Sequence, residues 1–390
     1  MIKIIDSYYQ CVFNLYKDIV CVSSESYEKD GIDKVCEMIK DFGIQNGFAA
    51  QIVKHKEAGN ELVLTYNEKN DGPITVFLAH MDTVHKKGAF EKMFKEEGNM
   101  VYGPGVHDCK GGIAVALLTC MALKASGYKN PLRIVLACDE EISMVLSKEK
   151  GTQFIIDNVK DAARVFTCES GIKDKMIVGR KGSARYKITI HGKAAHSGAN
   201  YDEGVSAIKA ACLMIPEIEK VSNSENMTFN CGLIKGGKAP NIIPDLCEFI
   251  VDTRYPDMNG MEESERHIYN VVSSNLPEGI TTEIEVISKR IPMEATEGNY
   301  KLFERVKRIS KELGYEDFVS FVSGGASDAA FPAAMGIPTL CGTGIVGKNQ
   351  HTLNEMADLS SIKTRSHLFV KTIVSLDRKG LSTEDYNEQL

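Results

Sequence analysis

Several features are missing from this 390-residue sequence, and each absence excludes a class of protein. Basic residues are not in excess, because 46 Lys and Arg stand against 53 Asp and Glu and the net charge is -7. Such a balance provides no basic surface for nucleic acid or for an anionic membrane. No apolar run is long enough to span a bilayer. We therefore expect neither nucleic acid nor a membrane among the partners.

The eleven cysteines also lack the short spacings of a disulfide framework. Their number is odd, and Cys138 and Cys168 lie inside apolar runs. This pattern is typical of buried, reduced thiols in a reducing compartment. From Met1 to Val20, apolar residues recur at helical spacing between polar ones, which predicts an amphipathic helix rather than a signal peptide. The sequence thus predicts a cytoplasmic protein.

Strand and helix patterns alternate from Asn60 to about Gly179, and no internal repeat or low-complexity segment interrupts them. The run from Ile74 to Ala79 is continuously apolar, as expected for a strand covered on both faces. The segment from Ile113 to Ala125 is apolar all round and predicts a buried helix. Further strands are predicted at Leu132–Cys138 and Arg164–Cys168. This alternation indicates an α/β fold with a largely parallel sheet.

The pattern changes near Gly182, where residues 185–191 alternate between polar and apolar as in a sheet with one wet face. The elements that follow predict the order β-α-β-β-α-β of a ferredoxin-like domain: a helix at 205–215, strands at 227–234 and 246–254, a helix at 261–274 and a strand at 281–288. The α/β pattern returns after Pro292, with a final helix from Ser360. We therefore predict a discontinuous domain, residues 1–180 and 293–390, interrupted by a smaller domain at 181–292.

Residues of metal-ligand type follow several predicted strands, namely His80, Asp108, Glu141, Glu169 and His351. Because sites in open α/β sheets form at the carboxyl ends of strands, we expect these side chains to converge. One member of the pair Glu140-Glu141 can bind a metal while the other handles protons. The residues alone do not show which is which. Asp82 lies two residues after His80 and is placed to accept the second imidazole N–H.

Eight motifs, in their residues and in their order along the chain, resemble those of the M20 metallopeptidase family. This family includes aminoacylases, glutamate carboxypeptidases, acetylornithine deacetylases and succinyl-diaminopimelate desuccinylases. The motifs extend over nearly the whole chain: HMDTV (80–84), GPGVHDCKGG (103–112), DEE (139–141), ESG (169–171), GKAAHSG (192–198), NIIP (241–244), DTR (252–254) and GGASD (324–328). The stretch 182–207 and the NIIP motif look most like the glutamate carboxypeptidase type. The resemblance implies a zinc-peptidase-like catalytic domain with an inserted dimerisation or lid domain.

The resemblance also implies a site for two Zn²⁺ ions, for which Co²⁺ or Mn²⁺ could substitute. His80 and Glu169 would bind one ion, Glu141 and His351 the other, and Asp108 would bridge both. Glu140 would then be the general base. The segment after it, Ile142–Leu146, departs from the small Gly-Ser-rich turn that relatives often have.

Four residues near or within the predicted insert are implied to contact substrate. His196 would stabilise the oxyanion in the partner subunit's active site, which makes a homodimer the expected assembly. Arg254 would hold a free carboxylate of a small-molecule or peptide substrate, and Asn241 a carbonyl or oxyanion. At Gly325 the backbone would approach the substrate closely.

The function implied is hydrolysis of an amide bond to an amino acid with a free carboxylate, by a carboxypeptidase or an N-acyl-amino-acid hydrolase. An alternative within the same chemistry is a deacylase of the acetylornithine or succinyl-diaminopimelate type, which a substrate panel would separate. An alternative of another class is a non-catalytic binding protein on the same fold. That reading predicts a lost ligand or base, whereas every expected position is filled.

Overall fold

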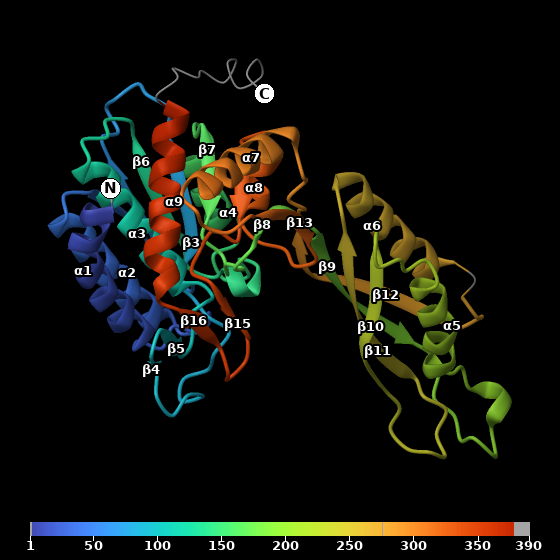
Figure 1. Ribbon diagram of the computed structural model, residues 1–390. Helices are drawn as coiled ribbons and strands as arrows, with labels where there is room; N and C mark the ends of the chain where they lie inside the picture. Colours follow the sequence, from blue (N-terminus) through green and yellow to red (C-terminus); the bar gives the residue numbers. More distant parts are fainter. Residues whose placement is uncertain (1, 275, 378–390) are drawn as a thin grey trace. The chain divides into compact units, whose positions relative to one another are not determined.

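The computed structural model describes residues 2–274 and 276–377 of the chain (Figure 1). These residues form two compact units. Unit 1 comprises the described residues of Met1–Gly179, Ala295–Val322 and Ser327–Leu390, and unit 2 those of Arg180–Glu294 and Ser323–Ala326. Within the described ranges, every helix is too short or too polar to cross a bilayer.

Unit 1 is built on an eight-stranded sheet in the order β1-β2-β6-β3-β7-β14-β8-β13. The strands are β1 (Ala49–Val53), β2 (Glu61–Tyr66), β3 (Thr75–His80), β6 (Leu132–Ala137), β7 (Arg164–Thr167), β8 (Lys175–Arg180), β13 (Val319–Ser323) and β14 (Thr339–Cys341). The four central strands β6, β3, β7 and β14 are parallel. Strands β1 and β2 on one side and β8 on the other pair antiparallel with their neighbours.

Helices cover both faces of this sheet, which explains why β3 is buried at all six positions. Phe77 and Ala79 of β3 belong to the core cluster on the face with the larger helices, whereas Val76 and Leu78 belong to the cluster with α4. The helices of unit 1 are α1 (Ile2–Val20), α2 (Lys29–Gln45), α3 (Lys110–Ala125), α4 (Glu149–Val159), α7 (Glu297–Glu312), α8 (Ala330–Ala334) and α9 (Ser360–Asp377). In Figure 1, α3 lies between α1 and α9 in front of the sheet.

The start of α3 is packed closely against the sheet and against α1. A Cβ atom on Gly112 would lie 1.9 Å from the carbonyl oxygen of Cys168, just beyond β7, so only glycine fits there. The fully buried Lys110 donates to the carbonyl oxygens of Ile19 and Val22 at 3.0 and 2.9 Å, where α1 ends. These contacts fix the position of the loop that precedes α3.

A second, four-stranded sheet lies in unit 1 in the order β15-β16-β5-β4. Its strands are short: β4 (Lys95–Glu97), β5 (Met100–Tyr102), β15 (Gly347–Lys348) and β16 (Met356–Asp358). The pairing of β5 with β16 brings residues near 102 beside residues near 356, far apart in the sequence. This sheet was not predicted, because its strands have only two or three residues and little periodicity.

Unit 2 contains one antiparallel sheet in the order β10-β11-β9-β12 and two helices. Along the chain the elements are β9 (Gly182–His191), α5 (Ala207–Glu219), β10 (Thr228–Gly236), β11 (Leu246–Tyr255), α6 (Met258–Ser273) and β12 (Thr281–Arg290). Burial alternates along β9 and β11, and the buried face packs against the helices. The predicted β-α-β-β-α-β order is confirmed, as is the α/β fold with a parallel sheet centre.

Candidate active site

His80 is the last residue of β3, and its side chain is only 1% exposed. Its Nδ1 atom lies 3.1 Å from the carbonyl oxygen of Asp82 and 3.2 Å from the Asp82 carboxylate. Its Nε2 atom lies 3.3 Å from Asp108 Oδ1. Because Nδ1 faces two acceptors, Nε2 is the nitrogen that would give up its proton to bind an ion beside Asp108.

Asp82 joins His80 to the pair of glutamates. Its two carboxylate oxygens accept the backbone N–H groups of Glu140 at 3.2 Å and Glu141 at 3.1 Å. The Ser26 hydroxyl donates to Asp82 Oδ2 at 2.6 Å. Although burial opposes the shift, hydrogen bonding with His80 lowers the pKa of Asp82 from its ordinary value. One buried carboxylate therefore orients the imidazole and the 3-10 turn at Glu140–Ile142 together.

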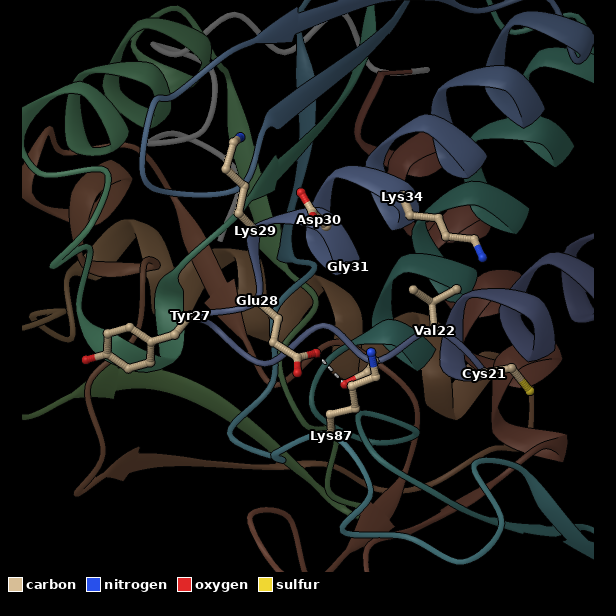
Figure 2. Close-up of a pocket in the computed structure, with 10 residues that line it drawn as sticks. Cys21, Val22, Tyr27, Glu28, Lys29, Asp30, Gly31, Lys34 and Lys87 are labelled. Carbon is tan, nitrogen blue, oxygen red and sulfur yellow. Dashed lines mark hydrogen bonds between the residues drawn. The ribbon is translucent and has the colours of Figure 1, made fainter.

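The segment that carries Ser26 connects α1 to α2 and runs beside residues 81–83. Ser26 donates its N–H to the carbonyl of Thr83 at 3.2 Å, and Thr83 returns a hydrogen bond to Ser24 at 2.9 Å. The same segment borders a polar cavity of about 640 Å³ at the start of α2, where the Ser23 hydroxyl donates to Glu28 at 2.7 Å (Figure 2). Lysines and acidic residues both line this cavity, and it contains none of the predicted site residues.

Asp108 projects from a loop that one buried carboxylate, Glu355, holds in place. Glu355 Oε1 accepts the N–H groups of His107 at 2.8 Å and Asp108 at 3.0 Å. Glu355 Oε2 accepts the N–H of Gly105 at 3.2 Å and lies 2.7 Å from His85 Nε2. Glu355 is 1% exposed, so these contacts are shielded from water. The backbone that presents Asp108 is therefore fixed independently of any ligand.

The Asp108 carboxylate lies between two histidines. Its Oδ1 lies 3.3 Å from His80 Nε2, and its Oδ2 lies 3.2 Å from His351 Nε2. His351 Nε2 is also 3.2 Å from Glu141 Oε2. Although burial opposes the shift, hydrogen bonds from His351 and His80 lower the pKa of Asp108. Asp108, Glu141 and His351 thus form one group, whose ligand atoms lie within 4.8 Å of one another.

Glu141 lacks part of the hydrogen bonding that a buried carboxylate needs. Its side chain is 6% exposed, and Oε1 has no hydrogen-bond partner among the described residues. Burial raises the pKa of Glu141 to about 8, and the nearby Asp108 charge adds to the shift. Hydrogen bonds with Asp108 and Glu141 raise the pKa of His351 to about 11. A cation at this group would satisfy the orphaned oxygen and replace the proton on His351.

Glu140 belongs to a different group from its neighbour Glu141. Ligand atoms of His80, Glu140 and Glu169 lie within 4.8 Å of one another, and all three residues are buried. Glu169 follows β7, and its carbonyl accepts the N–H of Gly344 at 3.0 Å. The structure therefore places six of the seven candidate residues of unit 1 in two adjoining groups that meet at His80 and Asp108, and the seventh, Asp82, supports both groups. Cys109 is also close to His80 and Asp108, but its sulfur contacts the His80 backbone.

The four predicted substrate contacts belong to unit 2. His196 is exposed, and its Nδ1 accepts the N–H groups of Gly198 and Ala199, each at 3.1 Å. The neutral ring therefore carries its proton on Nε2 and offers it as a donor. The carbonyl of Asn241 accepts the N–H of Ser197 at 3.0 Å, so Asn241 lies beside the loop of His196.

Arg254 forms an ion pair with Asp252 of its own strand, β11, which the sequence did not suggest. Its Nε and Nη2 atoms donate to the two oxygens of Asp252 at 2.7 and 3.2 Å, and Arg185 contacts the same carboxylate at 3.1 Å. About three of the five guanidinium N–H groups remain for another acceptor.

At Gly324 an added Cβ would meet nothing within 4 Å, and at Gly325 only Arg180 Nη1 at 3.6 Å. The packing of the chain thus does not require glycine at either position.

Sequence reasoning missed the residues that support the site from behind, above all Glu355 and Ser26. Both are buried polar residues whose partners are backbone N–H groups or a carboxylate distant in sequence. The residues that flank Glu355 and Ser26 in the sequence show no helical or strand periodicity. The position of Glu355, four residues after His351, was the only available hint.

Comparisons with known proteins show the family to which the chain belongs. The model of peptidase family M20/M25/M40 matches residues 76–375. Carboxypeptidase G2 from Pseudomonas sp. (strain RS-16) is 31% identical over 313 residues, which cover 78% of this chain and 74% of that protein. Succinyl-diaminopimelate desuccinylase from Rickettsia akari (strain Hartford) is 24% identical over 384 residues, covering 92% and 98%.

Solved structures show the same fold. A tripeptidase from Staphylococcus aureus superimposes with a TM-score of 0.78 at 23% identity, covering 95% of this chain and 99% of the other. A dinuclear metal-binding peptidase of the M20 family from Bacillus subtilis gives a TM-score of 0.69 at 16% identity, covering 95% and 99%. The chain is a hydrolytic enzyme, and it belongs to peptidase family M20/M25/M40.

Proposed function

We propose that this enzyme is a two-metal hydrolase that cleaves an amide bond to an amino acid with a free carboxylate, as a carboxypeptidase or an N-acyl-amino-acid hydrolase. The position of Asp108 carries the proposal. Its two oxygens face different histidines, and each histidine belongs to a separate group of ligand-type residues. A carboxylate shared in this way suits two cations held close together.

The donors fit the expected assignment of ligands. His80 and Glu169 would hold one ion, Glu141 and His351 the other, and Asp108 both. Asp82 accepts from His80 Nδ1, so Nε2 is the nitrogen that would bind an ion, and Glu141 Oε1 has no hydrogen-bond partner among the described residues. Nitrogen and oxygen donors suit Zn²⁺, and also Co²⁺ or Mn²⁺. Two bound ions would lower the pKa of the attacking water and polarise the scissile carbonyl.

Glu140 would serve as the general base. Its backbone is fixed through Asp82, and its side chain lies in the His80 group rather than with Glu141. A carboxylate held there can accept the proton of the attacking water and return it to the leaving amine. Asp82 would act through His80 and the glutamate turn, by orienting both.

Unit 1 would be the catalytic domain, and unit 2 a dimerisation or lid domain that recognises substrate. His196, with its proton on Nε2, can donate to a developing oxyanion, and Asn241 lies beside it. Arg254 retains N–H groups for a substrate carboxylate. Gly325 leaves space that the packing of the chain does not use. We propose that the enzyme acts as a homodimer in which His196 serves the partner's site.

Metal reconstitution combined with a substrate panel tests this function. Protein stripped with a chelator should be inactive, and Zn²⁺, Co²⁺ or Mn²⁺ should restore hydrolysis. The panel should contain dipeptides and N-acyl amino acids, each with a free carboxylate and as its amide. Hydrolysis restricted to the free carboxylates is the expected result. Full activity after removal of metal, or equal activity on the amides, would contradict the proposal.

A second candidate is a deacylase of the succinyl-diaminopimelate or acetylornithine type. It is favoured by the desuccinylase relative, whose similarity extends over nearly the full length of both chains. The same residues would act on an acylated amino acid whose acyl group is itself small or charged. Preference for N-succinyl or N-acetyl substrates over dipeptides in the same panel would favour this candidate.

A further inference from the structure

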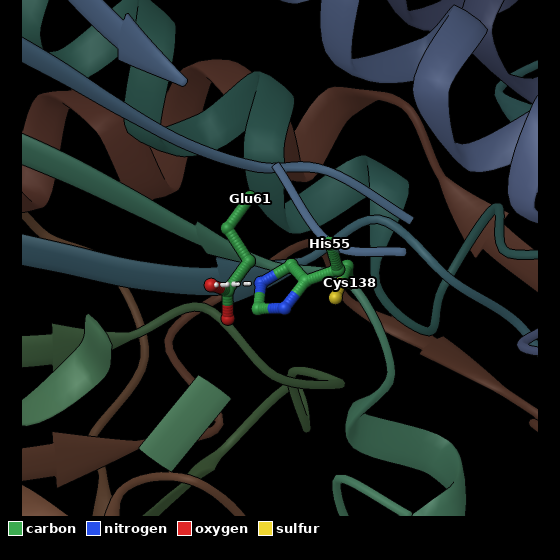
Figure 3. A group of neighbouring side chains, drawn as sticks. All are labelled: His55, Glu61 and Cys138. Carbon is green, nitrogen blue, oxygen red and sulfur yellow. Dashed lines mark hydrogen bonds and ion pairs between the residues drawn. The ribbon is translucent and has the colours of Figure 1, made fainter. Parts of the chain in front are cut away.

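A separate group of ligand-type side chains lies inside unit 1 (Figure 3). His55, Glu61 and Cys138 are all buried, and their ligand atoms lie within 4.8 Å of one another. His55 Nε2 lies 2.7 Å from Glu61 Oε2. None of the three belongs to the proposed active site, and no step of the proposed reaction uses them.

The pairing of the strands brings these residues together. Strands β2 and β6 are antiparallel, with Leu62 opposite Leu136. Glu61, the first residue of β2, therefore lies beside the end of β6, which Cys138 follows. His55 comes from the connection between β1 and β2. The cluster joins this connection to the segment that leads directly into Asp139 and the glutamate pair.

The cluster has an excess of buried acceptors. The Glu61 side chain is 1% exposed, and its Oε1 has no hydrogen-bond partner among the described residues. Asp139 is also buried, and it accepts the N–H groups of Leu146 and Ser147, the Ser147 hydroxyl and the Cys138 thiol, at 3.0, 2.8, 2.7 and 3.5 Å. Burial raises the pKa of Glu61 to about 7, although His55 opposes the shift. A buried carboxylate oxygen without a donor is unfavourable unless a cation satisfies it.

We propose that His55, Glu61 and Cys138 bind a further divalent cation, for which Zn²⁺ suits the donors best. Imidazole, carboxylate and thiolate are all zinc ligands, and water can supply a fourth. Binding would replace the His55–Glu61 hydrogen bond and the contact of the Cys138 thiol with Asp139, and it would release the thiol proton to solvent. The ion would fix the β1–β2 connection to the strand that carries the glutamates. The site is independent of the proposed function.

The thiolate makes this site distinguishable from the proposed active site, whose donors are nitrogen and oxygen only. Protein reconstituted with Co²⁺ should show a thiolate-to-cobalt charge-transfer band. Cys138→Ser should remove this band and reduce the zinc content by one ion per chain relative to wild type. Cys168→Ser is the matched control, because Cys168 is equally buried and follows the neighbouring strand β7. It should retain both the band and the ion.

Equal zinc content in wild type and Cys138→Ser, or a band that persists in Cys138→Ser, would overturn the proposal. If Cys138→Ser does not fold, zinc X-ray absorption of the wild-type protein decides the question. A sulfur neighbour of zinc is expected, and nitrogen and oxygen neighbours alone would contradict it. If the enzyme is active but contains no sulfur-bound zinc, only this site is refuted. If the enzyme contains sulfur-bound zinc but is inactive, only the proposed function is refuted.

Discussion

The candidate metal ligands in unit 1 and the candidate substrate contacts in unit 2 differ in how the chain holds them. Four of the five ligands have buried side chains, and the loop and turn that carry them are fixed by Asp82 and Glu355. His196 and Asn241 are exposed, and Arg254 is held by a single neighbouring carboxylate on its strand. The candidate metal ligands of unit 1 are thus held in place before any ligand binds. The candidate substrate contacts of unit 2 retain hydrogen-bond donors that the protein does not use.

This difference follows from the two sheets. The sheet of unit 1 is covered on both faces, so polar groups at its strand ends are buried and must be satisfied by one another. The sheet of unit 2 has one wet face, which carries Arg254, and His196 and Asn241 lie in exposed loops, so these polar side chains are solvated without a ligand. Substitutions in unit 1 should therefore change metal binding or chemistry, and substitutions in unit 2 should change recognition, except at His196, which is proposed to donate to the oxyanion.

The largest expected effect is that of Glu140→Gln on turnover. Loss of a general base lowers kcat by about 10²–10⁴-fold. The melting temperature should change little, because the backbone N–H of residue 140 donates the hydrogen bond to Asp82 and the substitution retains it. Steady-state kinetics and calorimetry measure the two effects. Activity within a few-fold of wild type would remove Glu140 from the reaction.

His196→Ala sharpens the comparison, since it should affect chemistry from unit 2. Loss of an oxyanion donor lowers kcat by roughly 10²–10³-fold, with zinc content unchanged. If His196 serves a partner's site, mixing this variant with Glu141→Gln should restore about a quarter of wild-type activity through mixed dimers, a proportion that symmetric pairing dictates. Absence of any restoration in a mixture shown to exchange subunits would contradict the shared site.

Glu355→Gln tests whether the loop of Asp108 depends on its buried support. The amide replaces one acceptor oxygen by a donor that faces backbone N–H groups. Zinc affinity should fall about 10–100-fold, as for other residues that orient ligands. Competition with a chromogenic chelator measures the affinity. Glu312→Gln, at an exposed helical position, is the control and should leave the affinity unchanged. Equal affinities in the two variants would refute the role.

Zinc affinity should also rise with pH. His351 must lose its proton to bind metal, and Asp108 and Glu141 raise its pKa to about 11 in the metal-free protein. The affinity should therefore increase about tenfold per pH unit for each proton released, up to that pKa. Isothermal titration in buffers of different ionisation enthalpy counts the protons. A zinc affinity that stays constant between about pH 6 and pH 8 would exclude His351 as a ligand.

The smallest effect is expected for Arg254→Lys. A lysine cannot present a planar fork, so KM for substrates with a free carboxylate should rise by roughly tenfold, or about 1.4 kcal/mol. Arg185→Lys is the matched control, since Arg185 contacts the same Asp252 from the neighbouring strand. A rise in KM common to both variants would indicate a structural effect on Asp252 rather than recognition.

Much of the fold was predictable because it rests on periodicity. The apolar runs at β3 and β6, the buried helix α3 and the alternating β9 are confirmed within a few residues, as is the α1 helix, with Met1 outside the described residues. Strands β1, β2 and β8 and the small sheet containing β5 and β16 were not predicted. Their pairing depends on contacts between distant segments, which periodicity does not report.

The candidate site divides in the same way. Ligand types at strand ends pointed to the groups around His80 and Asp108, since parallel strands end at one edge. The contacts of Asp82 with both glutamates, and of Glu355 with the Asp108 loop, follow only from the folded backbone. The pairing of Arg254 with Asp252 is local, yet nothing in the sequence separates it from a carboxylate left free for substrate.

The central claim is that adjacent glutamates have different roles, Glu141 as a ligand and Glu140 as the base. Zinc content of the purified Glu140→Gln and Glu141→Gln variants tests it directly against wild type. We predict that Glu140→Gln retains the wild-type zinc content and that Glu141→Gln loses one ion per chain. Loss of an ion from Glu140→Gln, with full occupancy in Glu141→Gln, would contradict the account.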